Sequence, residues 1–315
     1  MPTKITVIGA GSVGAAITND IMVQGIASEI LLIDINKQKA FGEALDIYQG
    51  APFCSPAIVR SGDYEDAAGS DIVIITSGVP RKPGQTRLEL AQTNVNILKQ
   101  ITPQIVKHAP DAIYILVSNP VDILTYVFHK ISGLPENQII GSGTVLDTAR
   151  LQAELAKRFH ISPKNVHAHV YGEHGDSSFV PWSLATIATN HVDYYKKAVD
   201  PDNKINWNDE YEEMEEFVRT SGGKVIKAKG ATFYAVAISV CHICKCIQAN
   251  AGTALTVSSL MHGEYGIEDV CLSTLALVDK SGIRSKIISP LTAEEEAKLR
   301  RSADKLKEVI SQLDI

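Results

Sequence analysis

The sequence lacks the features of a membrane protein or a nucleic-acid-binding protein. It has no apolar run approaching the roughly 18 residues of a membrane span, and the four-residue apolar stretch after Lys4 is too short for a secretory signal. It has no basic run with interleaved aromatics, and the net charge of -6 disfavours nonspecific binding to nucleic acid. We therefore expect neither a membrane nor a nucleic acid as partner.

Cysteine is scarce, and the five cysteines are odd in number, so they cannot all pair within the chain. Free thiols are typical of a reduced compartment, which predicts a cytoplasmic location. Cys241, Cys244 and Cys246 lie with His242 in a helical-looking stretch, Ala231–Ala249, where their side chains point around the helix. We interpret these cysteines as small buried hydrophobes rather than metal ligands.

Three histidines, His167, His169 and His174, also lie close together in the sequence. Residues two apart on a strand share a face, so these histidines could suggest a metal site. No acid cluster completes a ligand set, however, and we predict no bound metal.

The chain divides into two regions of different character. Its 315 residues, 45% of them hydrophobic, suffice for about two domains. We place a boundary at residues 145/146, which separates domain 1–145 from domain 146–315. In the first, short apolar runs alternate with helical periodicity and predict βαβ units with a parallel sheet. The expected strands are Ile5–Ile8, Ile30–Ile33, Ile72–Ile75 and Ile113–Val117, and the expected helices include Lys37–Tyr48 and Leu88–Val106.

The second region reads as a mixture of one strand and several helices. A helix should follow Leu146, a possible strand covers Val166–Tyr171, and we expect longer helices to dominate after that. Thr292 with Glu295 forms a capping box at the start of the last helix.

A glycine-rich motif indicates a dinucleotide site. Gly9, Gly11 and Gly14 in GAGSVG follow the first strand and open a helix, and Asp34 ends the second strand about 20 residues further on. Gly9 permits a tight turn, Gly11 lets the backbone approach a pyrophosphate, and Gly14 permits close packing of helix and strand. We expect the loop residues Ser12 and Val13 to contact the cofactor as well. The Asp34 charge would bind ribose hydroxyls and repel a 2′-phosphate, so it favours NAD over NADP.

Candidate catalytic groups lie in two further motifs. His174 in YGEHGDS stands between glycines just beyond the expected strand, where an imidazole can exchange protons near neutral pH. Asp147 and Arg150 in LDTAR lie three residues apart, on one helix face. Asp147 could orient the imidazole, and Arg150 could bind a carboxylate with two hydrogen bonds. Taken alone, the histidine could be structural and the Asp–Arg pair a surface ion pair, which would leave an NAD-binding regulator as a non-enzyme alternative.

Together these motifs identify a resemblance. GAGSVG, SNPVDILTY (Ser118–Tyr126), IGSGTVLDTAR (Ile140–Arg150) and YGEHGDSS (Tyr171–Ser178) resemble the lactate/malate dehydrogenase family, in register over nearly the whole chain. The resemblance implies an α/β fold in which a Rossmann domain, a doubly wound parallel sheet that binds NAD, precedes a mixed α/β catalytic domain. It also implies a small 2-keto or 2-hydroxy acid as substrate and a homotetramer.

The resemblance assigns a role to each candidate residue. His174 is the acid/base, Asp147 its partner, Arg150 the anchor of the substrate carboxylate and Arg87 the group that polarises the carbonyl. Asn119 contacts the nicotinamide and the substrate, and Thr232 lines the substrate pocket. The cationic stretch VPRKPGQTR (Val79–Arg87), which alone could be a solvated turn, is then a lid over the active site.

The choice between lactate and malate depends on opposing signals. Arg81 in the lid resembles the malate enzymes, because a buried guanidinium needs a second carboxylate such as that of oxaloacetate. Glu173, Thr232 and the long motifs resemble the lactate enzymes of fermentative bacteria. We expect lactate dehydrogenase activity with some turnover of oxaloacetate, and malate dehydrogenase activity is the alternative.

His167 matches a histidine that binds fructose 1,6-bisphosphate in many bacterial relatives, but Gln152 replaces the matching arginine, so we expect weak or absent activation.

Overall fold

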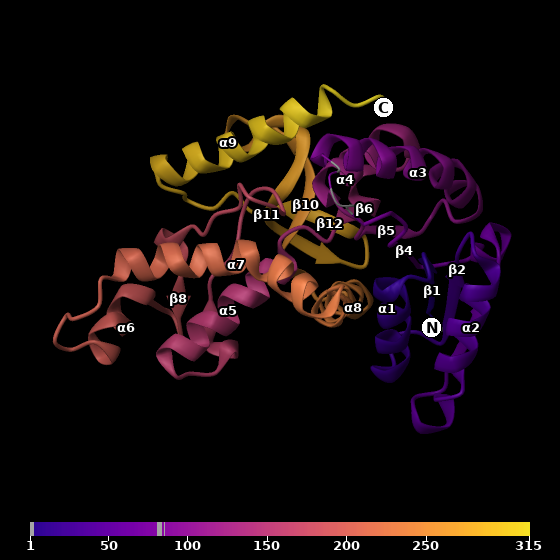
Figure 1. The fold of residues 1–315 in the computed structure, drawn as a ribbon, viewed down its shortest axis with the longest axis horizontal. Helices are drawn as coiled ribbons and strands as arrows, with labels where there is room; N and C mark the ends of the chain where they lie inside the picture. Colours follow the sequence, from indigo (N-terminus) through magenta and orange to yellow (C-terminus); the bar gives the residue numbers. More distant parts are fainter. Residues whose placement is uncertain (1–2, 81–83, 85) are drawn as a thin grey trace.

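The computed structural model describes residues 3–80, 84 and 86–315, which fold around one large sheet (Figure 1). The described strands are β1 Lys4–Ile8, β2 Glu29–Ile33, β3 Ile58–Ser61, β4 Ile72–Ile75, β5 Ile113–Leu116, β6 Ile139–Gly141, β7 Val166–His167, β8 Thr186–Ile187, β9 Asn190–His191, β10 Thr253–His262, β11 Glu268–Asp279 and β12 Gly282–Lys286. The described α-helices are α1 Ser12–Val23, α2 Lys37–Tyr48, α3 Arg87–His108, α4 Val121–Ser132, α5 Val145–Phe159, α6 Val192–Val199, α7 Trp207–Lys229, α8 Tyr234–Ala249 and α9 Ala293–Ile310.

The predicted βαβ units form six parallel strands in the order β6-β5-β4-β1-β2-β3. The strand order reverses between β1 and β4, and in such sheets ligands bind outside the carboxyl ends of the strands at this reversal. The glycine motif follows β1, and the cationic stretch follows β4. The topology therefore brings both motifs to one edge of the sheet.

Apolar side chains cover both faces of the parallel sheet. In β4, Ile72 and Ile74 belong to one buried cluster, with residues of α1, α2 and α8, while Val73 and Ile75 belong to another, with residues of α3, α4 and α9. Because successive side chains of a strand point to opposite faces, a continuous apolar run is what a strand covered on both sides needs. The doubly wound arrangement follows from that pattern.

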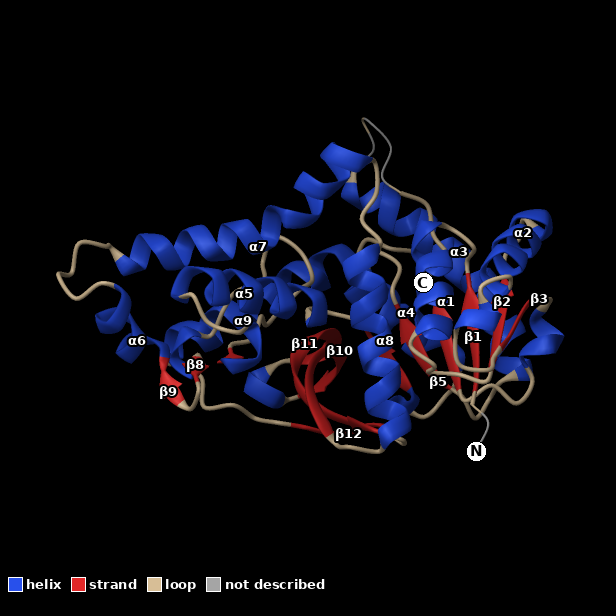
Figure 2. Ribbon diagram, turned by 90° about the horizontal axis from the view of Figure 1, so that it is seen from below, coloured by secondary structure: helices blue, strands red, loops and turns tan. Residues whose placement is uncertain are grey.

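The second half of the chain extends the same sheet. β10, β11 and β12 add to it in antiparallel orientation, and the pair Ser258–Gly141 joins β10 to β6. A third cluster, made by α5, α7 and the small sheet β7-β8-β9, fills the remainder of this half. Figure 2 shows α8 between the two halves, and Cys241 of this helix lies against the Ile17 carbonyl of α1.

The sequence reading of the second half was partly wrong. We expected longer helices to dominate after Tyr171, but β10 and β11 are long strands. Seven consecutive β10 residues, Leu255–Met261, are buried, and the alternation of polar and apolar residues breaks at Ser259, so it is too short to reveal the whole strand. The expected strand Val166–Tyr171 is shorter, because only β7 and an isolated bridge between Tyr171 and Phe179 form there.

Several local expectations are confirmed. α2 has the predicted bounds, and Thr292 and Glu295 form the capping box at the start of α9. Among the described residues, no helix is both long and apolar enough to cross a membrane.

Candidate active site

A cavity of about 250 Å³ lies where the two halves meet. It brings together residues that are far apart in the sequence: Asn119 after β5, Asp147 and Arg150 of α5, His174 in the loop after β7, and Thr232 between α7 and α8. Val13 of the glycine motif also lines it. The cavity thus joins the proposed cofactor loop to most of the predicted substrate residues.

Asp147 connects the two other ionisable residues of this set. Its Oδ2 lies 2.5 Å from His174 Nδ1, and its Oδ1 accepts a hydrogen bond from Arg150 Nη1 at 2.8 Å. The Asp147 side chain is only 7% exposed, against 25% for His174 and 16% for Arg150. The ion pair between Asp147 and Arg150 is therefore part of the cavity and not a surface pair.

The carboxylate of Asp147 controls the charge of the imidazole. Its negative charge raises the pKa of His174 to about 9, against the effect of burial, which alone would lower it. Burial alone would raise the pKa of Asp147, but the charges of His174 and Arg150 bring it below its ordinary value. At neutral pH the pair consists of a protonated His174 next to an ionised Asp147. The imidazolium of His174 can donate a proton into the cavity.

Buried groups from three elements hold the backbone of the loop that carries His174. Gly172 exchanges two backbone hydrogen bonds with Ser273 of β11. The Glu173 N–H donates to Ser302 Oγ of α9 at 2.7 Å, and the His174 N–H donates to Asp122 Oδ2 of α4 at 2.7 Å. The position of the imidazole is thus set by contacts that are remote in the sequence.

Asn119 is positioned by a buried amide. Asn94 of α3, which is 2% exposed, donates from Nδ2 to the Asn119 carbonyl at 2.7 Å and accepts from the Val79 N–H at 2.8 Å. One side chain therefore ties Asn119 to the start of the cationic stretch, and nothing in the local sequence around Asn94 pointed to this role.

The two arginines of the cationic stretch differ in whether the structure describes them. Arg81 lies outside the described residues. Arg87, the first residue of α3, is not among the cavity-lining residues and forms an ion pair with Asp176, with both side chains more than 60% exposed. Exposed pairs of this kind are weak, so Arg87 can exchange Asp176 for another anion at little energetic cost.

The glycine motif has the geometry that a dinucleotide requires. A Cβ on Gly14 would lie 1.8 Å from the Gly9 carbonyl oxygen, and one on Gly9 would lie 2.6 Å from Thr76 Oγ1. A Cβ on Gly11 would meet nothing within 4 Å, so the backbone there faces open space, and no side chain caps the start of α1. The N–H groups of the first turn, including those of Ser12 and Val13, are available to a pyrophosphate.

Asp34 closes this loop from the second strand. Its Oδ2 accepts from the Ala10 N–H at 2.6 Å, and its Oδ1 accepts from the Asn36 N–H at 2.8 Å. Each carboxylate oxygen has a further lone pair for a ribose hydroxyl. Lys37, a nearby cation that could attract a 2′-phosphate, is paired with Asp63. The residues present therefore fit NAD.

The cavity also contains polar residues that the sequence reading missed. Arg219 of α7 lines it and bonds to the Ser178 carbonyl and to Glu215, and Ser239 of α8 lines it as well. Both lie on helices with ordinary amphipathic patterns, which gave no signal of a site.

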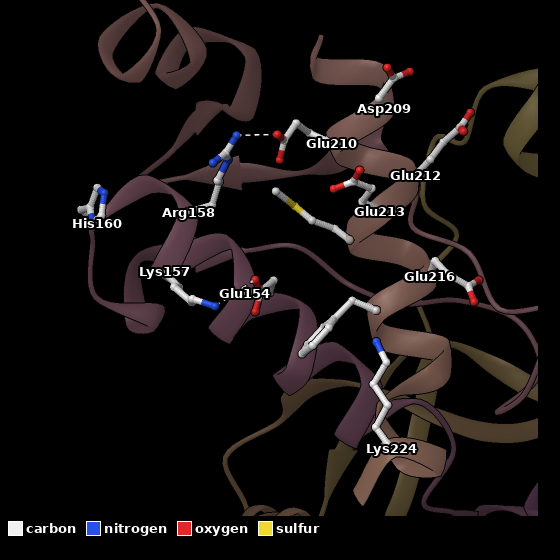
Figure 3. A pocket seen from close by; sticks show the side chains of 12 residues that line it. Glu154, Lys157, Arg158, His160, Asp209, Glu210, Glu212, Glu213, Glu216 and Lys224 are labelled. Atoms are coloured by element: carbon white, nitrogen blue, oxygen red, sulfur yellow. Dashed lines mark hydrogen bonds and ion pairs between the residues drawn. The ribbon is translucent and has the colours of Figure 1, made fainter. Parts of the chain in front are cut away.

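A larger cavity of about 910 Å³ lies between α5 and α7 and contains none of the predicted residues (Figure 3). Its charged side chains include the pair Arg158–Glu210 and the pair Lys157–Glu154. We assign no function to it.

Comparison with known proteins identifies the family. Residues 3–141 match the lactate/malate dehydrogenase NAD binding domain, and residues 144–314 match the α/β C-terminal domain of the same family. The chain belongs to the lactate/malate dehydrogenase family. Its first half is that family's NAD-binding domain, and its cofactor is NAD.

Relatives within the lactate/malate dehydrogenases match almost the whole chain. An L-lactate dehydrogenase of Clostridium botulinum is 47% identical over 310 residues, which cover 98% of this chain and 96% of the relative. L-lactate dehydrogenase 1 of Clostridium acetobutylicum is 47% identical over 311 residues, which cover 99% and 98%.

Solved structures in the family share the fold. The minor L-lactate dehydrogenase of Enterococcus mundtii superposes with a TM-score of 0.94 at 37% identity and covers 100% of this chain and 99% of its own. A lactate dehydrogenase from a Medee basin deep-sea metagenome library gives a TM-score of 0.93 at 36% identity, with 98% of each chain covered. Both superpositions support the mixed α/β fold with a Rossmann domain.

The cysteine-rich segment lies inside the core of this family member. Cys241 and Cys244 are fully buried in α8, and burial raises the pKa of the Cys241 thiol to about 12. Among the described residues, no group of three or more histidine, cysteine or acidic side chains is arranged to hold a metal. The absence of a bound metal remains a prediction.

The position of Asp34 predicts strong discrimination between cofactors. We expect kcat/KM with NADH to exceed that with NADPH by at least about a hundredfold, because a 2′-phosphate would face the Asp34 carboxylate. Steady-state kinetics with Asp34→Ser should reduce this ratio by about tenfold or more. Asp46→Ser, which removes an exposed acid from α2, is the matched control and should keep the ratio. Comparable kcat/KM of the wild-type enzyme with NADH and NADPH would contradict the role of Asp34 in excluding the 2′-phosphate.

Proposed function

We propose that this protein is an NAD-dependent L-lactate dehydrogenase that reduces pyruvate to L-lactate. The main support for this proposal is the arrangement of His174, Asp147 and Arg150 in one cavity with Asn119 and Thr232. Relatives that are 47% identical along almost their whole length carry the same name, which supports this choice over an NAD-binding regulator.

NADH, when bound, supplies the hydride, and the residues of this chain supply the remaining chemistry. Protonated His174 donates its proton to the keto oxygen, and Asp147 stabilises the imidazolium before the transfer and orients the ring. Arg150 keeps further N–H groups for the substrate carboxylate while one of its nitrogens bonds to Asp147.

Arg87 completes this reaction in our proposal. It exchanges Asp176 for the substrate oxygen on which negative charge develops. Ser12, Val13, Asp34 and the three motif glycines hold the dinucleotide, and Asn119 contacts both nicotinamide and substrate. The proposed domains are 1–145 for the cofactor and 146–315 for the substrate.

Lactate is favoured over malate by the residues around the cavity. Thr232 lines the cavity, as expected for a pocket that receives the pyruvate methyl group. Glu173 hydrogen-bonds to Ser177 within the loop and does not line the cavity. Arg81 is the opposing signal, and a guanidinium that points to solvent would not exclude pyruvate.

We further propose a homotetramer that works in the cytoplasm, in fermentative glycolysis. All five cysteines are free thiols, in accordance with a reduced compartment. Exposed apolar side chains on α2 and α8, which flank α1, offer a surface for another subunit (Figure 1). These side chains are Phe41, Leu45 and Tyr48 of α2 and Tyr234 and Ile238 of α8.

Weak or absent activation by fructose 1,6-bisphosphate is also part of this proposal. Gln152 stands where an arginine would bind a phosphate group, and its amide donates to the Ala168 carbonyl at 3.2 Å. His167 is exposed, but without the guanidinium it has no cationic partner at that position.

The pKa of His174 predicts the pH dependence of both reaction directions. Because reduction needs the imidazolium, kcat/KM for pyruvate should be level at neutral pH and fall above about pH 9. Lactate oxidation needs the neutral ring, so its kcat/KM should rise toward the same pH. Asp147→Asn removes the charge that raises this pKa and should move both limbs down by roughly 1–2 pH units. A wild-type limb near pH 6.5 would contradict the assignment.

Kinetics with pyruvate and oxaloacetate side by side test the substrate. We expect the wild-type enzyme to prefer pyruvate and to turn over some oxaloacetate through Arg81. Arg81→Gln should lose the oxaloacetate activity and keep or improve pyruvate turnover. Lys82→Gln removes a neighbouring charge from the same stretch and serves as the control. If the wild type prefers oxaloacetate by about a hundredfold or more, the enzyme is a malate dehydrogenase.

Light scattering tests the assembly. We expect a particle of four chains, and Phe41→Glu combined with Ile238→Lys should yield smaller particles, because charges on a buried interface cost several kcal/mol. Tyr194→Lys, on the exposed part of α6, should leave the size unchanged. A wild-type monomer at micromolar concentration would refute the tetramer.

A further inference from the structure

Two walls of the substrate cavity come from different parts of the chain. Helix α7 lines one side through Arg219 and Gly222, and the loop that carries His174 lines another through Ser178. A Cβ on Gly222 would lie 3.7 Å from Arg150 Nη2, so α7 passes next to the proposed carboxylate anchor. The room for a substrate therefore depends on how closely α7 approaches this loop.

One carboxylate of α7 connects the helix to the loop at two points. Glu215 accepts from the Trp182 indole Nε1 at 2.8 Å with one oxygen and from Arg219 Nη1 at 3.1 Å with the other. Arg219 Nη1 also donates to the Ser178 carbonyl at 3.2 Å. Glu215 thus holds the segment after His174 directly at Trp182 and, through Arg219, at Ser178.

These contacts are largely protected from solvent. The side chains of Glu215 and Arg219 are 13% and 23% exposed, and Ser178 is 5% exposed. The Trp182 ring stacks on Tyr211, one turn of α7 before Glu215, with the ring centroids 3.9 Å apart. Because water screens partly buried charges less than exposed ones, the Glu215–Arg219 pair should be stronger than a surface pair on the same helix.

Ser178 passes this restraint on to His174. The Ser178 N–H and hydroxyl both donate to the Gly175 carbonyl, at 3.3 Å and 3.0 Å, so the residues from Gly175 to Ser178 form a tight turn. Gly175 follows His174 directly in the sequence. A shift of the Ser178 carbonyl would therefore move the backbone next to the imidazole.

We propose that Glu215 and Arg219 form a clamp that holds α7 against this loop and sets the width of the substrate cavity. This role rests on the proposed function, in which the cavity receives pyruvate. Glu215 does not line the cavity, so it is a positioning residue that acts through Arg219 and Trp182. The property that the clamp controls is the size of the 2-keto acid that the enzyme prefers.

Glu215→Ala breaks both contacts and is the main test. Steady-state kinetics should show the KM for pyruvate raised roughly tenfold and kcat within about threefold of the wild type, because the wider cavity binds pyruvate less closely. Relative to pyruvate, kcat/KM for 2-ketobutyrate and 2-ketovalerate should rise by about fivefold or more, since the wider cavity admits their additional methylene groups. A residue that merely stabilised the fold would lower kcat/KM for all three acids by the same factor.

Two further variants test whether the clamp is the cause. Arg219→Gln removes the ion pair from its other side and should shift the size preference in the same direction, whereas Trp182→Phe removes only the indole N–H and should shift it less. The pyruvate KM of Glu215→Ala/Arg219→Gln should not exceed that of the more affected single variant, because both substitutions remove the same contact. If Glu215→Ala does not fold, Glu215→Gln, which keeps one acceptor oxygen, should show a smaller shift of the same sign.

Glu216→Ala is the matched control. Glu216 is the next residue of α7 and carries the same charge, but it is 63% exposed, and its carboxylate lies 3.4 Å from Arg219 Nε. Its loss should change neither the pyruvate KM nor the size preference. An unchanged size preference in Glu215→Ala would overturn the proposal, and so would an equal change in Glu216→Ala.

A measurement without substrate separates the clamp from the proposed function. In enzyme labelled with ¹⁵N-tryptophan, the Trp182 indole resonance, assigned by its loss in Trp182→Phe, should move upfield in Glu215→Ala, because the N–H loses its acceptor. It should not move in Glu216→Ala. An unmoved resonance in Glu215→Ala would refute the clamp whatever the substrate is, whereas a wild-type enzyme that reduces no keto acid would refute the proposed function.

Discussion

The active site depends on one carboxylate, that of Asp147, which bonds to His174 through one oxygen and to Arg150 through the other. Burial would otherwise lower the pKa of the imidazole and leave it neutral at physiological pH. The same burial strengthens the ion pairs, because water screens partly buried charges less than exposed ones. A single side chain of α5 thus holds His174 and Arg150, the proton donor and the carboxylate anchor of our proposal, in fixed relation.

That carboxylate can act only because the large sheet extends through both halves of the chain. The β6–β10 pairing joins the parallel strands to the antiparallel ones, which brings β11 next to the loop that carries His174. Ser302 of α9 and Asp122 of α4 then hold consecutive N–H groups of that loop. These buried contacts, to β11 and to two helices on the same face of the sheet, hold the backbone of the loop.

The ion pair of Arg87, which exchanges its partner in our proposal, has the opposite physical character. Arg87 and Asp176 are both largely exposed, and solvent weakens their attraction, whereas Asp147 is almost completely buried. In our proposal, Arg87 must exchange its partner during the reaction and is held weakly, whereas Asp147 must keep its position and is held strongly. Asn94 connects the start of the cationic stretch to the cavity, because it bonds to both Val79 and Asn119.

The sequence by itself determined the parallel sheet, the glycine motif, the family and the choice of candidate site residues. These features are local: continuous apolar runs specify buried strands, and only glycine fits the contacts at Gly9 and Gly14. Tertiary structure decided what no local pattern contains. It placed Asp122, Ser302 and Asn94 behind the site, although Ser302 lies 129 residues from its partner Glu173. It also formed β10 and β11, which are buried along most of their length and therefore do not show a continuous alternation of polar and apolar residues.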